Sequence, residues 1–207
     1  MRVRPAARAD AAAIYRLCAA VDATGAAAPP RYHRPELPGH LYAGPYLAAS
    51  PGLTFVADVD GVAGYVAAVA DTARFADWAE RCWWPRLRRR YPLTPDPHDG
   101  TRDHALVAAI HAGSGPRRPW HDSHPAHLHI KVAARAQGRG CGRRLMGTVL
   151  GALHRRGVPG VHLGVAEANR KAVTFYFALG FTEAHRHPWG RTLVLDLPEW
   201  RQTCATW

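Results

Sequence analysis

A glycine-rich turn at residues 137–142 places the strongest constraint on what this chain can fold into. The residues before it alternate as in a half-buried strand, with Leu128, Ile130 and Val132 on the apolar face. The residues after it have the spacing of an amphipathic helix, namely Leu145, Met146, Val149, Leu150 and Leu153. Backbone N–H groups of such a turn meet the positive end of the helix, and glycines let an anion approach them closely. The segment therefore predicts a site for a diphosphate group.

The spacing of the turn excludes two common diphosphate sites. A Walker loop has Lys and then Ser or Thr after its last glycine, whereas Arg143 and Arg144 follow Gly142 here. A dinucleotide-binding fold has Gly-x-Gly-x-x-Gly early in a βαβ unit, whereas this turn lies well past the middle of the chain. The pattern that starts at Gln137, Gln-x-x-Gly-x-Gly, resembles the acyl-coenzyme A loop of the GNAT acetyltransferase superfamily.

A second motif follows downstream. Residues 161–166 have the composition of a strand, and 169–181 that of a short helix that ends at a glycine. The positions of Asn169, Ala172 and Tyr176, and of the Gly-Phe pair at 180–181, resemble the second GNAT motif. Both motifs occur in the order of the superfamily, and the resemblance covers most of the chain.

A closer resemblance lies within that superfamily. Residues 124–130 and 156–165 look like the bacterial relatives of the acetyltransferase-like domain of O-GlcNAcase. The Trp-rich stretch at 78–85 is similar to the same O-GlcNAcase-like subgroup.

The resemblance implies an α/β (α+β) GNAT fold. Its mixed central sheet of about six or seven strands is flanked by helices, and the two central parallel strands splay into a V. We expect one domain over residues 1–207, with irregular or inserted segments at 22–52 and 71–125. The patterns predict strands at 2–4, 53–57, 62–70, 127–133, 161–166 and 192–196, and helices at 10–20, 71–90, 141–156 and 169–179. Residues 105–110 fit a strand or a helix equally well.

Composition limits the class of protein further. No apolar run approaches membrane-spanning length, so no membrane partner is expected. The cysteines, Cys18, Cys82, Cys141 and Cys204, have no paired spacing, which is typical of reduced thiols and a cytoplasmic location.

The formal net charge of +11 raises the question of a nucleic-acid partner. The basic residues are dispersed apart from a cluster at 86–90, which is typical of a solvated helix end. No nucleic acid is therefore expected as a partner, whereas the charge suits the anionic phosphates of coenzyme A. The histidine run at 121–129 has no nearby cysteine and no evident distant ligand, so no metal site is predicted.

The resemblance implies acetyl-CoA as cosubstrate. It places the pyrophosphate on the amides of the glycine turn, and the pantetheine arm on the main chain of the preceding strand. The implied cofactor-binding residues are Ile130, Lys131, Val132, Gln137, Gly138, Arg139, Gly140, Cys141, Gly142, Arg143, Asn169 and Tyr176. For Asn169 a helix N-cap is an equally good interpretation. Cys141 is either a small core residue or a thiol whose pKa the helix N-terminus lowers.

The resemblance also implies that Tyr176 protonates the leaving thiolate. For the general base the strand offers His127 and His129, which share one face with Lys131. Further candidates are Asp122, His124 and Glu167, and a structural histidine is an alternative throughout.

Two functions from different classes remain. The first is an acetyl-CoA-dependent N-acetyltransferase, an enzyme that moves an acetyl group to a primary amine of a small molecule or a protein lysine by direct attack. The second is a catalytically silent binding module, but the retained turn glycines favour the enzyme. The acceptor is open, and a monomer and a homodimer fit equally well. Candidate aromatic residues for an acceptor pocket are Tyr32, Tyr42, Tyr46, Trp83, Trp84 and Trp120.

Overall fold

A computed structural model describes residues 1–20, 32–93, 102–198 and 200. These residues build one mixed seven-stranded sheet in the order β1-β2-β3-β4-β5-β7-β6. Its strands are β1 (Arg2–Pro5), β2 (Thr54–Asp58), β3 (Val62–Val69), β4 (Ala126–Val132), β5 (Gly160–Ala166), β6 (Thr182–His187) and β7 (Gly190–Asp196). Only β4 and β5 run parallel, while the other neighbouring pairs are antiparallel. The predicted fold class is confirmed.

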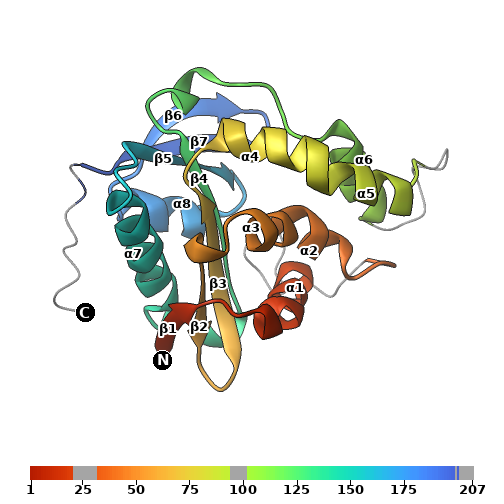
Figure 1. Cartoon of the computed structure of the whole chain (residues 1–207). Helices are drawn as coiled ribbons and strands as arrows, with labels where there is room; N and C mark the ends of the chain where they lie inside the picture. Colours follow the sequence, from red (N-terminus) through yellow and green to blue (C-terminus); the bar gives the residue numbers. More distant parts are fainter. Residues whose placement is uncertain (21–31, 94–101, 199, 201–207) are drawn as a thin grey trace.

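Helices cover both faces of the sheet. They are α1 (Ala11–Ala20), α2 (Leu37–Tyr42), α3 (Gly44–Ala49), α4 (Thr72–Trp78), α5 (Trp84–Arg90), α6 (Asp103–Ala112), α7 (Cys141–His154) and α8 (Arg170–Phe177). A π-helical turn, Ala79–Trp83, joins α4 to α5. In Figure 1, α7 and α8 lie on one side of the strands, and α1 to α3 lie on the other. None of the described helices is both long and apolar enough to cross a membrane.

The alternation of β4 separates the two cores. Leu128, Ile130 and Val132 pack with α7 and α8, as their apolar pattern predicts. On the other face, His127 and His129 contact aromatic rings of α2 and α3. One strand therefore contributes to two chemically different surfaces, because successive side chains point to opposite faces of a sheet.

The two parallel strands separate soon after they start. Their ladder pairs Ala126 with Val161 and His127 with His162, and it ends there. Both strands continue, β4 to Val132 and β5 to Ala166, while β3 stays paired with β4 along its length. The edge of β4 that faces β5 is thus free of ladder bonds beyond His127, which confirms the predicted V.

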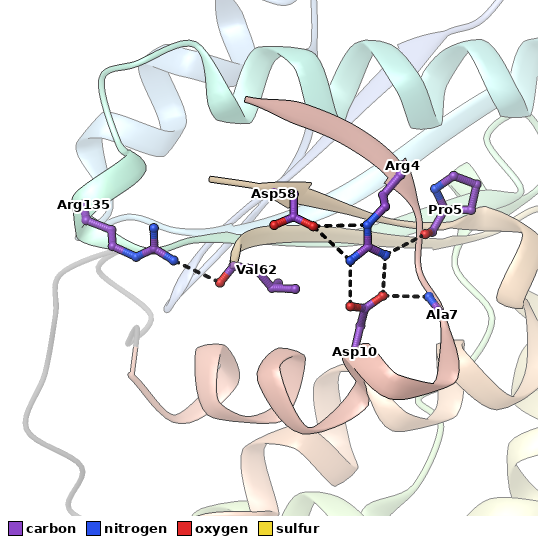
Figure 2. Close-up of polar contacts among 7 residues, drawn as sticks. All are labelled: Arg4, Pro5, Ala7, Asp10, Asp58, Val62 and Arg135. Carbon is purple, nitrogen blue, oxygen red and sulfur yellow. Dashed lines mark hydrogen bonds and ion pairs between the residues drawn. The ribbon is translucent and has the colours of Figure 1, made fainter. Parts of the chain in front are cut away.

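An ion network anchors the edge of the sheet beneath the β2–β3 hairpin (Figure 2). The Arg4 guanidinium binds both carboxylate oxygens of Asp10, at 2.6 and 2.9 Å, and one oxygen of Asp58, at 3.0 Å. The amide of Ala7 donates to Asp10 as well, at 2.7 Å. Arg4 also holds the pKa of the Asp10 carboxyl below its usual value. The Arg4 guanidinium therefore joins β1 to β2 and to the turn that leads into α1.

The structure settles two segments that the sequence left open and adds a strand. The described part of segment 22–52 is mainly helical, and residues 105–110, for which strand and helix fitted equally well, belong to helix α6. Strand β6 was not predicted, because its residues are polar and mostly exposed at the sheet edge. Residues 22–31 and 94–101 lie outside the described part.

Candidate functional site

The glycine turn has the backbone that only glycine adopts easily. Gly138 and Gly140 have φ of 71° and 75°, in the region that L side chains rarely occupy. A Cβ atom placed on either would meet no atom within 4 Å. The glycines therefore serve the turn itself and leave the space in front of it open.

The start of α7 faces this open space. Gly140 is the N-cap of the helix, and the first helical bond runs from the Arg144 amide to the Gly140 carbonyl at 3.1 Å. Amides ahead of Arg144 have no carbonyl within the helix to bind, and the helix dipole adds partial positive charge. Because the open end of the V lies at the same point, the site suits an extended ligand with a diphosphate.

Four contacts hold the turn against the sheet. The Ala133 amide donates to Ala63 O at 2.8 Å, and Gln137 Nε2 donates to Val132 O at 3.0 Å. Arg135 donates to two carbonyls of the β2–β3 hairpin, Val59 O at 2.5 Å and Val62 O at 3.3 Å. Figure 2 shows the second of these bonds beside the Arg4 network. The Gln137 side chain thus braces the turn through the strand that precedes it.

Cys141 belongs to the core. Its side chain is 1% exposed, and a Cβ on Gly64 would lie 3.2 Å from its Sγ. Burial raises the pKa of the Cys141 thiol. The alternative of a thiolate activated by the helix N-terminus is therefore wrong, because desolvation penalises the charged form.

Helix α8 brings the second motif to the same side of the sheet. Asn169 caps the helix, with its Oδ1 accepting from the Ala172 amide at 3.2 Å. The Phe175 ring lies beside the start of α7, 3.4 Å from a Cβ placed on Gly142. Tyr176 is buried between Phe175 and Phe181, and burial raises the pKa of its phenol. The Tyr176 phenol therefore stays protonated at neutral pH.

On the opposite face, His127 sits in a chain of hydrogen bonds. The Thr72 hydroxyl donates to Pro125 O at 2.7 Å, so it accepts from Nδ1–H of His127, also at 2.7 Å. The other ring nitrogen, Nε2, then accepts from the Tyr46 hydroxyl at 2.9 Å. Burial lowers the pKa of His127 to about 3. This neutral ring has both nitrogens engaged, which is the arrangement of a structural histidine.

His129 differs from His127 in one respect that matters for catalysis. It is half-buried against the Tyr42 ring, with ring centroids 4.9 Å apart. Within the described part of the chain, neither of its ring nitrogens has a hydrogen-bond partner. Burial, and then the nearby charge of Lys131, lower the pKa of His129 to about 4. A neutral imidazole with an available lone pair is a proton acceptor.

The remaining base candidates are engaged elsewhere. Asp122 pairs with Arg117, and Glu167 pairs with Arg191. His124 Nδ1 is hydrogen-bonded to the Ser123 hydroxyl at 2.8 Å, while its Nε2 lies 3.2 Å from a carboxylate oxygen of Asp196 without forming a hydrogen bond. The Lys131 ammonium donates to Cys18 O at 3.0 Å. His129 is therefore the best placed of the predicted bases.

The predicted aromatic residues divide between roles. Tyr42 and Tyr46 surround the histidines of β4. The indoles of Trp83 and Trp84 donate to His40 O and Ser114 Oγ. The sequence analysis missed Trp189, which is 56% exposed next to the V, because a lone Trp in a turn has no periodic signal.

Comparison with known proteins identifies a family and several similar structures. The family model described as the acetyltransferase (GNAT) family matches residues 24–181. The solved structure of SsHAT is 36% identical, with a TM-score of 0.87, and the match covers 95% of this chain and 98% of that one. The putative acetyltransferase yncA from Salmonella typhimurium, solved with acetyl-CoA, is 18% identical (TM-score 0.56, 95% and 94% covered). The ribosomal-protein-S18-alanine N-acetyltransferase from Escherichia coli is 16% identical (TM-score 0.52, 95% and 93% covered).

The family match and the fold thus define an acyltransferase that uses acetyl-CoA. The chain belongs to the acetyltransferase (GNAT) family. The predictions of enzyme class and cosubstrate are confirmed at this level, whereas the relation to O-GlcNAcase stays a prediction.

Proposed function

We propose that the protein transfers the acetyl group of acetyl-CoA directly to a primary amine, on a small molecule or a protein lysine. One observation carries this proposal: the ladder between β4 and β5 stops at His127, and the glycine turn lies at the open end of the V. A splayed strand edge offers main-chain groups to an extended ligand, and the turn offers amides to its diphosphate.

The residues present fit acetyl-CoA. The space in front of Gly138 and Gly140 is open, as a pyrophosphate requires. We assign the pyrophosphate to the backbone of the turn and the pantetheine arm to the main chain of Ile130, Lys131 and Val132. The remaining assigned residues are Gln137, Arg139, Cys141, Gly142, Arg143, Asn169 and Tyr176.

In the proposed mechanism acetyl-CoA supplies the activated acetyl group as a thioester. His129, neutral and with an available nitrogen, takes the proton of the attacking amine. Tyr176, protonated and buried on the other face, gives a proton to the leaving thiolate. No covalent step through Cys141 is needed, because its thiol is sealed in the core.

The rival function is a catalytically silent binding module. We further propose that the chain belongs with the bacterial relatives of the O-GlcNAcase domain, on the residues at 124–130 and 156–165. Retention of the turn glycines, Asn169 and Tyr176 supports the enzyme over the silent module. The described cysteines are free thiols, which supports the predicted cytoplasmic location.

Calorimetric titration with acetyl-CoA tests the proposal. Wild type is expected to bind in the micromolar range, and Gly140→Trp is expected to abolish binding by filling the pyrophosphate space. Gly157→Trp is a matched control, since Gly157 has φ of 70° and equally open surroundings beyond the other end of α7. It should strain the backbone similarly and leave acetyl-CoA affinity unchanged. A folded wild type that does not bind acetyl-CoA would contradict the proposed function.

A further inference from the structure

The register of the central strands places His129 opposite a glycine. Because His127 pairs with His162, the next positions on that face are His129 of β4 and Gly164 of β5. At these positions the strands have already separated. The V therefore opens between the proposed base on one side and a residue without a side chain on the other.

Trp189 occupies the space that a side chain at Gly164 would take. A Cβ on Gly164 would lie 3.1 Å from Cη2 of the indole. The turn that carries Trp189 is held close to β5, since a Cβ on Gly190 would clash with the carbonyl oxygen of Val165. The backbone thus positions the indole over the β5 side of the V.

One face of the indole is supported and the other is free. Trp189 stacks on His187, with centroids 4.6 Å apart and ring planes at 8°. His187 bonds Thr192 Oγ1 through Nε2 at 2.9 Å, and Trp120 packs behind it at 6.3 Å. His187 belongs to β6, which lies on the far side of β5 from β4. The indole face that does not stack on His187 is the one open to a ligand, since Trp189 is 56% exposed.

Aromatic rings form both sides of this opening, and the Lys131 ammonium lies beside the β4 side, 6.0 Å from the centre of the Tyr42 ring. Trp189 and His187 form the β5 side, and desolvation lowers the pKa of His187. Tyr42, Tyr46 and His129 form the β4 side. Among these described residues there is no carboxylate that would select a cation by charge.

We propose that Trp189 determines acceptor specificity, and that it selects primary amines carried on an aromatic or apolar stem. The stem packs on the free face of the indole while the amine reaches His129. This inference rests on the proposed acetyl transfer, and it adds the acceptor class.

The test compares two probe amines, phenethylamine with an aromatic stem and ethanolamine with a short polar one, by release of coenzyme A. Wild type is expected to prefer phenethylamine in kcat/KM by at least about tenfold. Trp189→Ala should bring the ratio of the two kcat/KM values close to one, mainly through a higher KM for phenethylamine. Trp189→Phe should restore most of the preference, since a flat ring remains.

Control measurements distinguish a failure of this inference from a failure of the proposed acetyl transfer. Leu93→Ala removes a side chain that is equally exposed, at 56%, and should leave the preference unchanged. Acetyl-CoA affinity of Trp189→Ala should match wild type. The inference is overturned if wild type binds acetyl-CoA yet shows no preference or acetylates neither amine, or if Trp189→Ala keeps the preference. Failure of wild type to bind acetyl-CoA at all would instead overturn the proposed function.

Discussion

The two faces of β4 carry different kinds of chemistry and are covered by different parts of the chain. On the α7 side, Leu128 and Ile130 pack into an apolar core beside a glycine turn that immediately follows the strand. On the other side, His127 and His129 meet rings from α2, α3 and α4 that are distant in sequence. The first face depends on backbone conformation within a short segment. The second depends on side chains that only the fold brings together, and the two faces should therefore respond differently to substitution.

The largest effect is expected at the tyrosine on the α7 side. Tyr176→Phe removes the proposed acid and keeps the ring between Phe175 and Phe181. We expect kcat to fall roughly 1000-fold while acetyl-CoA affinity stays unchanged. Steady-state turnover together with calorimetry measures both. Unchanged kcat would show that Tyr176 is only a core residue. The α7 side of β4 would then contribute cofactor binding and packing but no acid.

The two histidines of the other face should separate catalysis from stability. His129→Gln is expected to lower kcat/KM about 100-fold, because the proposed base is lost. His127→Gln should instead lower the free energy of unfolding by about 1–3 kcal/mol, since partners at both ring nitrogens are disturbed. Steady-state kinetics and denaturant unfolding of the two variants test this. A loss of kcat/KM in His127→Gln and a loss of stability in His129→Gln would instead make His127 the base and His129 the structural residue.

The same pair predicts a pH dependence. The folded pKa values of His127 and His129, about 3 and about 4, lie below the ordinary histidine value. The unfolded chain therefore binds more protons, so these rings contribute stability above about pH 6.5 that is lost as pH falls toward their folded pKa values. As the pH is lowered from 7 to 4, the free energy of unfolding should decrease for wild type. It should decrease less steeply for His127→Gln.

The Arg4 network supports the β2–β3 hairpin, to which Arg135 ties the glycine turn. Arg4→Met is expected to cost about 2 kcal/mol of stability, between the values for surface and buried pairs, because Asp58 is about one-third exposed. Arg4 lowers the pKa of Asp10, so this contribution is present above the unfolded aspartate pKa and is lost as pH falls through the folded one. Unfolding curves at pH 7 and pH 3 should differ less for Arg4→Met than for wild type. An equal difference would mean that the network adds no pH-dependent stability.

The smallest effect is expected at Arg135, which ties the glycine turn to Val59 O and Val62 O. Arg135→Ala should weaken acetyl-CoA binding about fivefold, because a looser turn loses more freedom on binding. Arg156→Ala is the matched control, since Arg156 donates to Ala152 O and Gly52 O near the other end of α7. Calorimetry should show wild-type affinity for Arg156→Ala. Equal losses in both variants would assign the effect to general destabilisation.

The α7 side was largely predictable from sequence. The strand, turn and helix around Gly140 appear as one continuous pattern, and the cap at Asn169 follows from local residue chemistry. Strand β6 was missed because an exposed edge strand needs no apolar alternation. Residues 105–110 were ambiguous because a short apolar run fits a strand as well as a buried helix.

The other side was predictable only in part. Alternation along β4 placed His127 and His129 on one face, as the structure has it. It did not distinguish them, because Thr72 and Tyr46, which occupy both nitrogens of His127, come from other elements. Trp189 was not considered at all, since its position depends on the missing side chain of Gly164 on a neighbouring strand.

The sequence by itself determined the strand, glycine turn and helix around Gly140, because backbone conformation and periodicity are encoded locally in a short segment. Its two motifs also indicated the family, and the sheet with its parallel central pair followed only from that resemblance. Only the tertiary structure decided which histidine keeps an available nitrogen, that Cys141 is sealed in the core, and that an indole stands across the V from His129. Hydrogen-bond partners, burial and ring contacts arise between segments far apart in the chain, and their geometry exists only once the sheet and its helices have packed.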